Sequence, residues 1–219
     1  MYLDTQKGKF IVLEGGDGAG KSTCMQYVRE VFGEERFVYT REPGGTALGT
    51  SIRQILLMGE AMDPVTEMLL FFASRVEHIA RIIGPALQEG KHVLCDRFVL
   101  SSYAYQIVGR QRDELTGLYN DLYNHTVLPF VTPYYIYLDV EPETALKRVV
   151  GEDGGKKTRF DNEAYAFHAR VREGYHACLA TMPNDMYTTI TRTGRLSYEE
   201  VGEMVIRVIQ KVIGSDTHT

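Results

Sequence analysis

The chain has 219 residues, enough for one domain with a substantial buried core, and it carries a formal net charge of −5 at pH 7. This acidic balance argues against a general nucleic-acid binder. No apolar run reaches the length of a membrane span or a signal-peptide core. From the charge we therefore expect no nucleic-acid partner, and from the missing apolar run no membrane partner. Three widely spaced cysteines (Cys24, Cys95 and Cys178) are typical of buried thiols in a reducing compartment, which predicts a cytoplasmic protein without disulfides or zinc.

Strand-like and helix-like segments alternate along the chain. Short apolar runs rich in branched residues indicate buried strands, and longer runs with apolar residues every three or four positions indicate helices. In chain order we expect a strand at 10–13, a helix at 21–32, a strand at 36–40, helices at 46–59 and 64–90, a strand at 92–95, a helix from Ser102, a helix at 111–128, a strand at 134–140, helices at 142–150 and 161–181, a strand at 186–191 and a helix at 197–213.

The helix expected at 64–90 has signals at both ends. Pro64 suits a first helical position, and Gly90 suits the residue that follows the last turn. Phe72 falls on the apolar stripe of this helix, so the neighbouring Phe71 must point elsewhere. The stripe is expected to face the core and consists of Val65, Met68, Leu69, Phe72, Val76, Ile79, Ala80, Ile83 and Leu87.

Strands that alternate with helices predict an α/β fold, with a parallel sheet covered by helices on both faces. Such a sheet binds its ligands at the carboxyl ends of the strands. We therefore expect a single domain over 1–219 with five parallel strands. The glycine-rich, charged segment 151–157 predicts a short mobile lid at about 149–160.

The first expected strand leads into a loop, 15–22, that fits the pattern G-x-x-x-x-G-K-[ST]. Glycines let backbone N–H groups turn toward an anion, and the helix that follows adds its dipole. Lys21 would reach the β- and γ-phosphates of a nucleotide, and the Ser22 hydroxyl would bind Mg²⁺. A chance glycine turn is the alternative, but the position between a strand and a helix favours a phosphate site. The residues expected at the phosphates of ATP are Gly15, Gly16, Asp17, Gly18, Ala19, Gly20, Lys21, Ser22 and Thr23.

Asp96 and Arg97 end the third expected strand. A carboxylate at this position can hold the water shell of a magnesium ion beside the phosphate loop. The alternative is a plain salt bridge between Asp96 and Arg97, and we favour the metal role.

Candidate ligand-binding side chains follow the other elements. Arg41 ends the second strand, where 43–45 forces a turn, although it could be an ordinary surface charge. Phe71 and Arg75 lie four residues apart on one helix face, which suits a stacked and hydrogen-bonded base as well as it suits a core ring with a salt bridge. The segment 101–106 supplies neutral hydrogen-bonding groups or is simply a polar turn.

Together these motifs resemble the thymidylate kinases of the nucleoside monophosphate kinase superfamily. The likeness runs from about Phe10 to Val212. It is carried by FIVLEGGDGAGKST, TREPGGT, LLFFASRVEHI, DRFVLSSYAYQ and YLDVEPETALKR. The resemblance implies a P-loop NTPase fold, a homodimer, and transfer of the γ-phosphoryl group of ATP to dTMP with Mg²⁺.

The resemblance also implies roles for individual residues. Asp17 would lie near the 3′-hydroxyl of the deoxyribose, and Tyr105 would occupy the space of a 2′-hydroxyl. Phe71 would stack on thymine, while Arg75 would bind a base carbonyl. The residues implied at dTMP are Asp17, Arg41, Pro43, Phe71, Arg75, Arg97, Ser102, Tyr105 and Gln106, and those implied in catalysis are Lys21, Arg97, Arg159 and Asp17.

The catalytic arginine of this family comes from the P-loop or from the lid. The P-loop position is Gly18 here, so the lid must supply it. Arg159 is the best candidate, and the possible helpers are Arg148, Lys156 and Lys157.

Phosphoryl transfer to a nucleoside monophosphate needs no general base, because its second pKa of about 6 leaves the phosphate ionised at neutral pH. The histidines at 78, 92, 125, 168 and 176 show no ligand or triad spacing, so we expect none of them to be catalytic. Two alternatives stay open: a kinase for another nucleoside monophosphate, and a P-loop ATPase or switch. An N-K-x-D guanine reader, which a guanine switch needs, is not found in the sequence.

Overall fold

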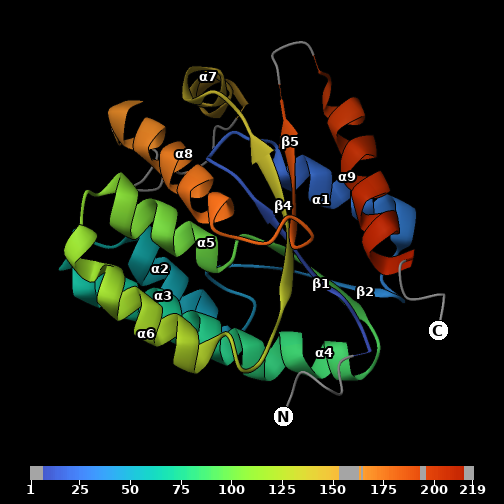
Figure 1. The fold of residues 1–219 in the computed structure, drawn as a ribbon, viewed down its shortest axis with the longest axis horizontal. Coiled ribbons are helices and arrows are strands. Elements are labelled where there is room, and N and C mark those ends of the chain that lie inside the picture. The colour runs from blue at the N-terminus through green and yellow to red at the C-terminus, as the bar shows by residue number, and fades with distance from the viewer. Residues whose placement is uncertain (1–6, 153–162, 164, 193–195, 215–219) are drawn as a thin grey trace.

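The computed structural model describes residues 7–152, 163, 165–192 and 196–214. Within these ranges five strands form one parallel sheet in the order β2-β3-β1-β4-β5 (Figure 1). Their bounds are β1 (Phe10–Glu14), β2 (Phe37–Arg41), β3 (His92–Asp96), β4 (Pro133–Asp139) and β5 (Tyr187–Thr191). Each strand begins within one residue of its predicted start, and the predicted α/β sheet is confirmed.

Helices cover both faces of the sheet (Figure 1). One face carries α1 and α9, and the other carries α2, α3, α5, α6 and α8. The helices are α1 (Lys21–Phe32), α2 (Ala47–Met58), α3 (Pro64–His78), α4 (Gly84–Gln88), α5 (Val99–Ser102), α6 (Thr116–Thr126), α7 (Pro142–Glu152), α8 (Tyr165–Ala180) and α9 (Tyr198–Gly214). No helix among the described residues is both long enough and apolar enough to cross a bilayer.

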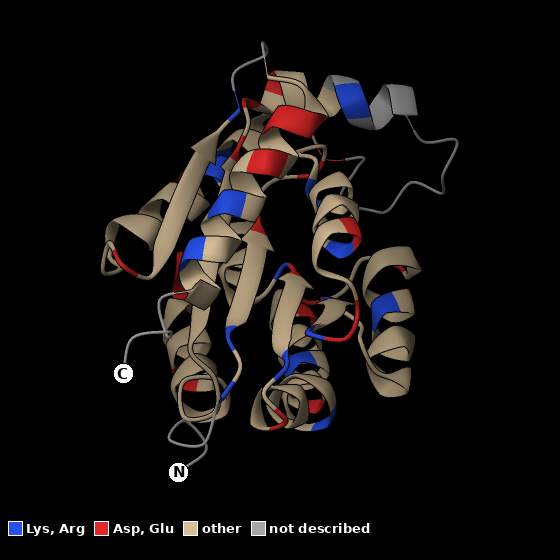
Figure 2. Cartoon of the chain, turned by 90° about the vertical axis from the view of Figure 1, so that its right-hand side faces the viewer, with Lys and Arg blue, Asp and Glu red and all other residues tan. Residues whose placement is uncertain are grey.

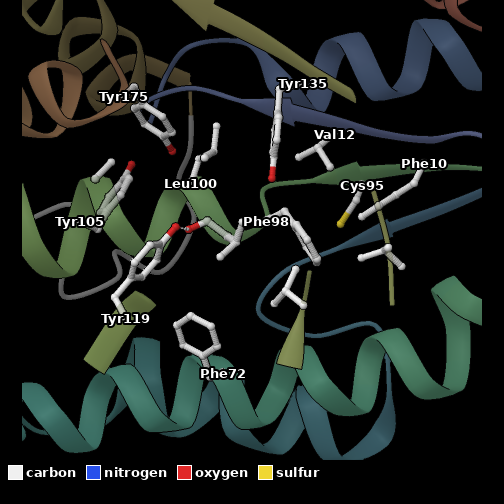
Figure 3. Packing of buried hydrophobic residues seen from close by; sticks show 14 of the residues in the cluster. Phe10, Val12, Phe72, Cys95, Phe98, Leu100, Tyr105, Tyr119, Tyr135 and Tyr175 are labelled. Atoms are coloured by element: carbon white, nitrogen blue, oxygen red, sulfur yellow. Dashed lines mark hydrogen bonds between the residues drawn. The ribbon is translucent and has the colours of Figure 1, made fainter. Parts of the chain in front are cut away.

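Each face of the sheet has its own hydrophobic core. The core under α1 and α9 contains Leu13 and Ile136, and the core on the opposite face is rich in aromatic rings. Figure 3 shows Phe72, Phe98 and Tyr135 of this second core between the sheet and α3. Acidic and basic residues are interspersed over the helices in the view of Figure 2. Cys24 and Cys95 are buried as predicted, whereas Cys178 is only half-buried.

The helix predicted at 64–90 is present but not continuous. It begins at Pro64, where Asp63 Oδ1 accepts hydrogen bonds from the N–H groups of Val65 and Thr66. After His78 it widens into a π-helix over Ile79–Ile83 and then resumes as α4. The reason is Pro85, which lacks an N–H and whose ring would clash with the carbonyl four residues earlier in a regular helix.

The predicted apolar stripe on this helix is only partly correct. Met68, Phe72, Ile79, Ile83 and Leu87 are buried as expected. In contrast, Ala80 is exposed, as are three apolar residues of α3, namely Val65 (39%), Leu69 (45%) and Val76 (42%). The apolar positions therefore span two faces, of which only one meets the core.

Two further helix starts were predicted wrongly. The helix expected from Ser102 begins at Val99, because the Glu14 carboxylate on β1 accepts the N–H groups of Phe98 (2.9 Å) and Ser101 (3.3 Å). Such a cap comes from a residue 84 positions away and leaves no local pattern. The helix expected at 111–128 begins only at Thr116, after a 3₁₀ turn. Gln111 has a positive φ, which is incompatible with a right-handed helix at that residue.

Candidate active site

The glycine-rich loop lies between β1 and α1, as predicted. Gly15, Gly18 and Gly20 all have positive φ, a region that glycine enters without steric cost. A Cβ on Gly15 would stand 2.7 Å from the carbonyl oxygen of Leu138, so a side chain does not fit there. The backbone can therefore follow the tight path that a phosphate-binding loop requires.

Lys21 is the first residue of α1, and its side chain is buried against the loop. Its Nζ donates to the carbonyl oxygens of Gly15 (3.0 Å) and Gly16 (2.9 Å). Burial lowers the pKa of Lys21 to about 8, and the positive charge of Arg97 acts in the same direction. An anion beside Nζ would stabilise the ammonium form.

A cavity of about 260 Å³, here called the P-loop cavity, opens in front of this lysine. It gathers most of the residues predicted around phosphate and metal. It is lined by Asp17, Gly18, Gly20, Lys21, Ser22, Thr23, Arg41, Glu42, Arg53, Asp96, Arg97, Arg148 and Tyr198.

Asp96 ends β3 in this cavity, paired in register with Arg41 at the end of β2. Its Oδ1 is buried and has no hydrogen-bond partner among the described residues. A buried carboxylate oxygen without a partner is costly unless a ligand completes it. Ser22 lines the same cavity. The pair fits a magnesium ion, which binds through one or two protein oxygens, water and substrate phosphates. The described residues contain no cluster of three or more His, Cys, Asp or Glu side chains that would form an all-protein site.

Arg97 and Asp17 form the centre of the site. Arg97 Nη2 donates to Asp17 Oδ1 at 2.6 Å, while Nη1 donates to the Gly15 carbonyl oxygen at 2.9 Å. The Tyr105 hydroxyl donates to the other carboxylate oxygen of Asp17 at 2.9 Å. Burial raises the pKa of Asp17, but the charges of Arg97 and Lys21 outweigh it, and the net pKa lies below its usual value. The site therefore holds an ionised carboxylate between two cations.

A second cavity of about 120 Å³, here called the Phe71 cavity, adjoins the first. Four residues line both cavities: Asp17, Glu42, Arg53 and Arg97. The complete lining is Asp17, Glu42, Pro43, Arg53, Leu57, Phe71, Arg97, Ser101, Tyr105 and Gln106. Phe71 lines this cavity but also packs, half-buried, against the aromatic core, so the prediction that it points elsewhere is only partly correct.

Two predicted ligand residues, Arg75 and Ser102, lie in a layer behind this cavity. Arg75 is only 1% exposed, and its Nε donates to Glu42 Oε2 at 2.7 Å. Its Nη2 donates to the Ser102 hydroxyl at 3.0 Å, while Nη1 is buried and finds no partner in the described part of the chain. In the described structure Ser101 lines the cavity in place of Ser102.

Sequence reasoning did not point to Glu42, Arg53, Leu57, Ser101 and Tyr198, which line the two cavities, nor to a role for His78 behind them. Besides Arg75, Glu42 contacts His78, with 3.0 Å between Glu42 Oε1 and His78 Nδ1. The other ring nitrogen of His78, Nε2, lies 2.7 Å from the Thr40 hydroxyl. Arg53 donates to the Pro43 carbonyl oxygen at 3.0 Å. A signal for Arg53 existed, because it is the only charged residue in its helix. Ser101 and the buried pairing of His78 depend on contacts between distant segments and had no local signal.

The lid candidates divide between described and undescribed parts of the chain. Arg148 on α7 lines the P-loop cavity, with its guanidinium 5.7 Å from the centre of the Tyr198 ring. Arg159, Lys156 and Lys157 lie outside the described residues.

Comparison with known proteins agrees with this geometry. The family model described as thymidylate kinase matches residues 13–205. A thymidylate kinase of Bacillus velezensis is 38% identical over 212 residues, covering 94% of this chain and 98% of that protein. One from Clostridium novyi is 42% identical over 184 residues, covering 81% and 88% respectively. The crystal structure of thymidylate kinase from Ehrlichia chaffeensis superposes with a TM-score of 0.69 and 31% identity, covering 93% of this chain and 98% of that one. This chain therefore belongs to the thymidylate kinase family.

Proposed function

We propose that this protein transfers the γ-phosphoryl group of ATP to dTMP, producing ADP and dTDP. One observation supports the proposal most strongly: the P-loop cavity and the Phe71 cavity share lining residues, among them Asp17 and Arg97. A donor and an acceptor nucleotide bound in these cavities would bring their phosphates together there.

The P-loop cavity would hold the triphosphate of ATP. The backbone N–H groups of the loop and the N-terminus of α1 face the phosphates in such a site. Lys21 would leave its two carbonyl partners for the β- and γ-phosphates. When bound, Mg²⁺ neutralises charge on the transferred group, and Ser22 and Asp96 would hold it.

The Phe71 cavity would hold dTMP. Phe71 would stack on the thymine ring, while Gln106 would meet its polar edge and Arg75 would support the site from the layer behind the cavity. Tyr105 would fill the space of a 2′-hydroxyl, and Asp17 would approach the 3′-hydroxyl. Pro43 would line the sugar side of the cavity. Arg41 and Arg97 would bind the acceptor phosphate, for which a planar guanidinium offers two parallel donors.

This arrangement requires positioning and charge neutralisation but no proton abstraction. The phosphate of dTMP is already largely ionised at neutral pH, because its second pKa is about 6. Lys21, Arg97 and a lid arginine, which we assign to Arg159 with Arg148 as helper, would absorb charge on the moving phosphoryl group. Closure of the lid at 149–160 would exclude water from it.

The protein is further proposed to act as a cytoplasmic homodimer. Six exposed apolar residues on two adjacent helices support self-association: Leu48, Ile55 and Met58 on α2, and Val65, Leu69 and Val76 on α3.

A panel of acceptors tests the proposal. ADP release from ATP and Mg²⁺ would be measured with dTMP, dUMP, the ribo-analogue of dTMP, AMP, CMP and GMP, and each product identified. We expect rapid turnover with dTMP, alone or with weaker turnover of dUMP. Preference for another monophosphate would favour the near alternative. Slow hydrolysis that no acceptor accelerates would favour an ATPase or switch.

A further inference from the structure

Gln106 lines the Phe71 cavity and belongs to the π-helical segment Tyr103–Gly109. Only 2% of its surface is exposed. Its side chain ends in a primary amide, which carries one acceptor and one donor group side by side. A half-turn of the amide exchanges them, so the hydrogen bonds that Gln106 offers depend on what holds the amide.

Glu67 on α3 holds it. Gln106 Nε2 donates to Glu67 Oε1 at 3.0 Å, and Glu67 is itself 2% exposed. Arg110 Nε lies 3.3 Å from the same oxygen and places a positive charge beside it. A carboxylate oxygen only accepts hydrogen bonds, so the amide nitrogen must face it. In the flipped amide, the carbonyl oxygen of Gln106 would face the carboxylate oxygen of Glu67. Two buried acceptors in contact without a proton between them are unfavourable.

The carbonyl of Gln106 is consequently turned away from Glu67. The carbonyl oxygen of Gln106, Oε1, makes no hydrogen bond to the described residues. It is also not fully enclosed by protein atoms. Since Gln106 lines the Phe71 cavity, this oxygen is an acceptor that is open to a ligand there.

We propose that Glu67 is a positioning residue that selects the base of the acceptor by fixing the amide of Gln106. The inference rests on the proposed function, in which the base occupies the Phe71 cavity. Thymine and uracil carry N3–H between two carbonyl groups, whereas cytosine carries an unprotonated N3 beside an amino group. A fixed carbonyl accepts from N3–H but faces the lone pair of cytosine. A glutamine free to flip would serve both kinds of base. Glu67 therefore favours imide bases without touching them.

The test is the selectivity between dTMP and dCMP, measured with both present in one reaction. Their ratio of kcat/KM does not depend on the fraction of folded enzyme. We expect Glu67→Gln, whose amide can donate as well as accept, to lower this ratio by about tenfold or more. Glu67→Asp keeps a pure acceptor and should keep most of the ratio. Arg110→Gln is the matched control: it removes the ion pairs with Glu67 and Glu163 but leaves the Glu67–Gln106 bond that fixes the amide, and should change the ratio by less than about twofold.

Several outcomes would overturn the inference. One is an unchanged ratio in Glu67→Gln, and another is an equal fall in Arg110→Gln. If Glu67→Gln has no activity, Gln106→Leu is measured instead, because it removes the amide itself. The dTMP/dCMP ratio of kcat/KM should then fall as expected for Glu67→Gln, and an unchanged ratio would refute the inference. A wild-type enzyme that accepts dCMP as well as dTMP would refute the inference but leave the kinase in place. A wild-type enzyme that phosphorylates no acceptor would refute the proposed function itself.

Discussion

The P-loop cavity and the Phe71 cavity are adjacent but built differently. Nearly half of the described residues that line the first lie within 17–23, and the others come from the ends of β2 and β3 and from α2, α7 and α9. The second draws on the turn after β2, on α2 and α3, and on the segment 101–106. The P-loop cavity suits a polyphosphate, which many nucleotides share. The Phe71 cavity suits one particular base and sugar.

The layers behind the two cavities also differ. Lys21 rests on backbone carbonyl groups of its own loop. Arg75, in contrast, is held by Glu42, which in turn pairs with His78. Gly45 completes this packing, because a Cβ there would stand 2.4 Å from the His78 ring. Substitutions in the P-loop cavity should therefore reduce catalysis for every acceptor, while those around the Phe71 cavity should change KM and selectivity.

The largest effect is expected for Lys21→Ala. Loss of the only lysine at the P-loop cavity in the described structure should lower kcat/KM by about 10³-fold with all acceptors. Steady-state kinetics would measure it, with the exposed Lys211→Ala as a control near wild-type activity. Activity within about tenfold of wild type would contradict the assigned role.

Arg97→Lys should rank next. The guanidinium contacts Asp17, Gly15, Ser101 and Tyr175, and an ammonium cannot reproduce that fork. We expect kcat to fall by about 10²-fold, with Arg207→Lys on the exposed face of α9 as the matched control. A change in KM alone would show that Arg97 only binds the acceptor.

Arg53→Ala tests which of the two nucleotides depends on a residue that lines both cavities. Removing one charged hydrogen-bond donor should raise the KM for dTMP by about tenfold. The neighbouring exposed Gln54→Ala should leave it unchanged. If the KM for ATP rises and that for dTMP does not, Arg53 belongs to the donor side alone.

The smallest effect concerns pH. The pKa of Lys21 is lowered to about 8, so the free enzyme carries the charged form below that pH and loses it above. The kcat/KM for ATP should therefore decline as pH rises through 8, by about fourfold at pH 8.5. Lys21→Arg keeps its charge, and its residual activity should show no such decline. An equal decline in that variant would assign the titration to another group.

The sequence predicted what local pattern determines. The five strands and the P-loop follow from apolar runs and glycine spacing. The Ser-x-x-Glu pattern at 197–200 is typical of a capping box, and the structure has its reciprocal bonds of 2.7 and 3.2 Å. The start of α5 could not be predicted, because Glu14 caps it from another strand. The same holds for Ser101 and for the Glu67–Gln106 pair, whose roles arise only when distant segments meet.

The central claim is that the γ-phosphoryl group of ATP goes to dTMP and not to water. Its most direct test follows the label from γ-labelled ATP with Mg²⁺ and dTMP over many turnovers. The account predicts that nearly all released label appears in dTDP, and that leaving out dTMP reduces ATP consumption to a slow background. Label found in inorganic phosphate at a rate that dTMP does not change would contradict it.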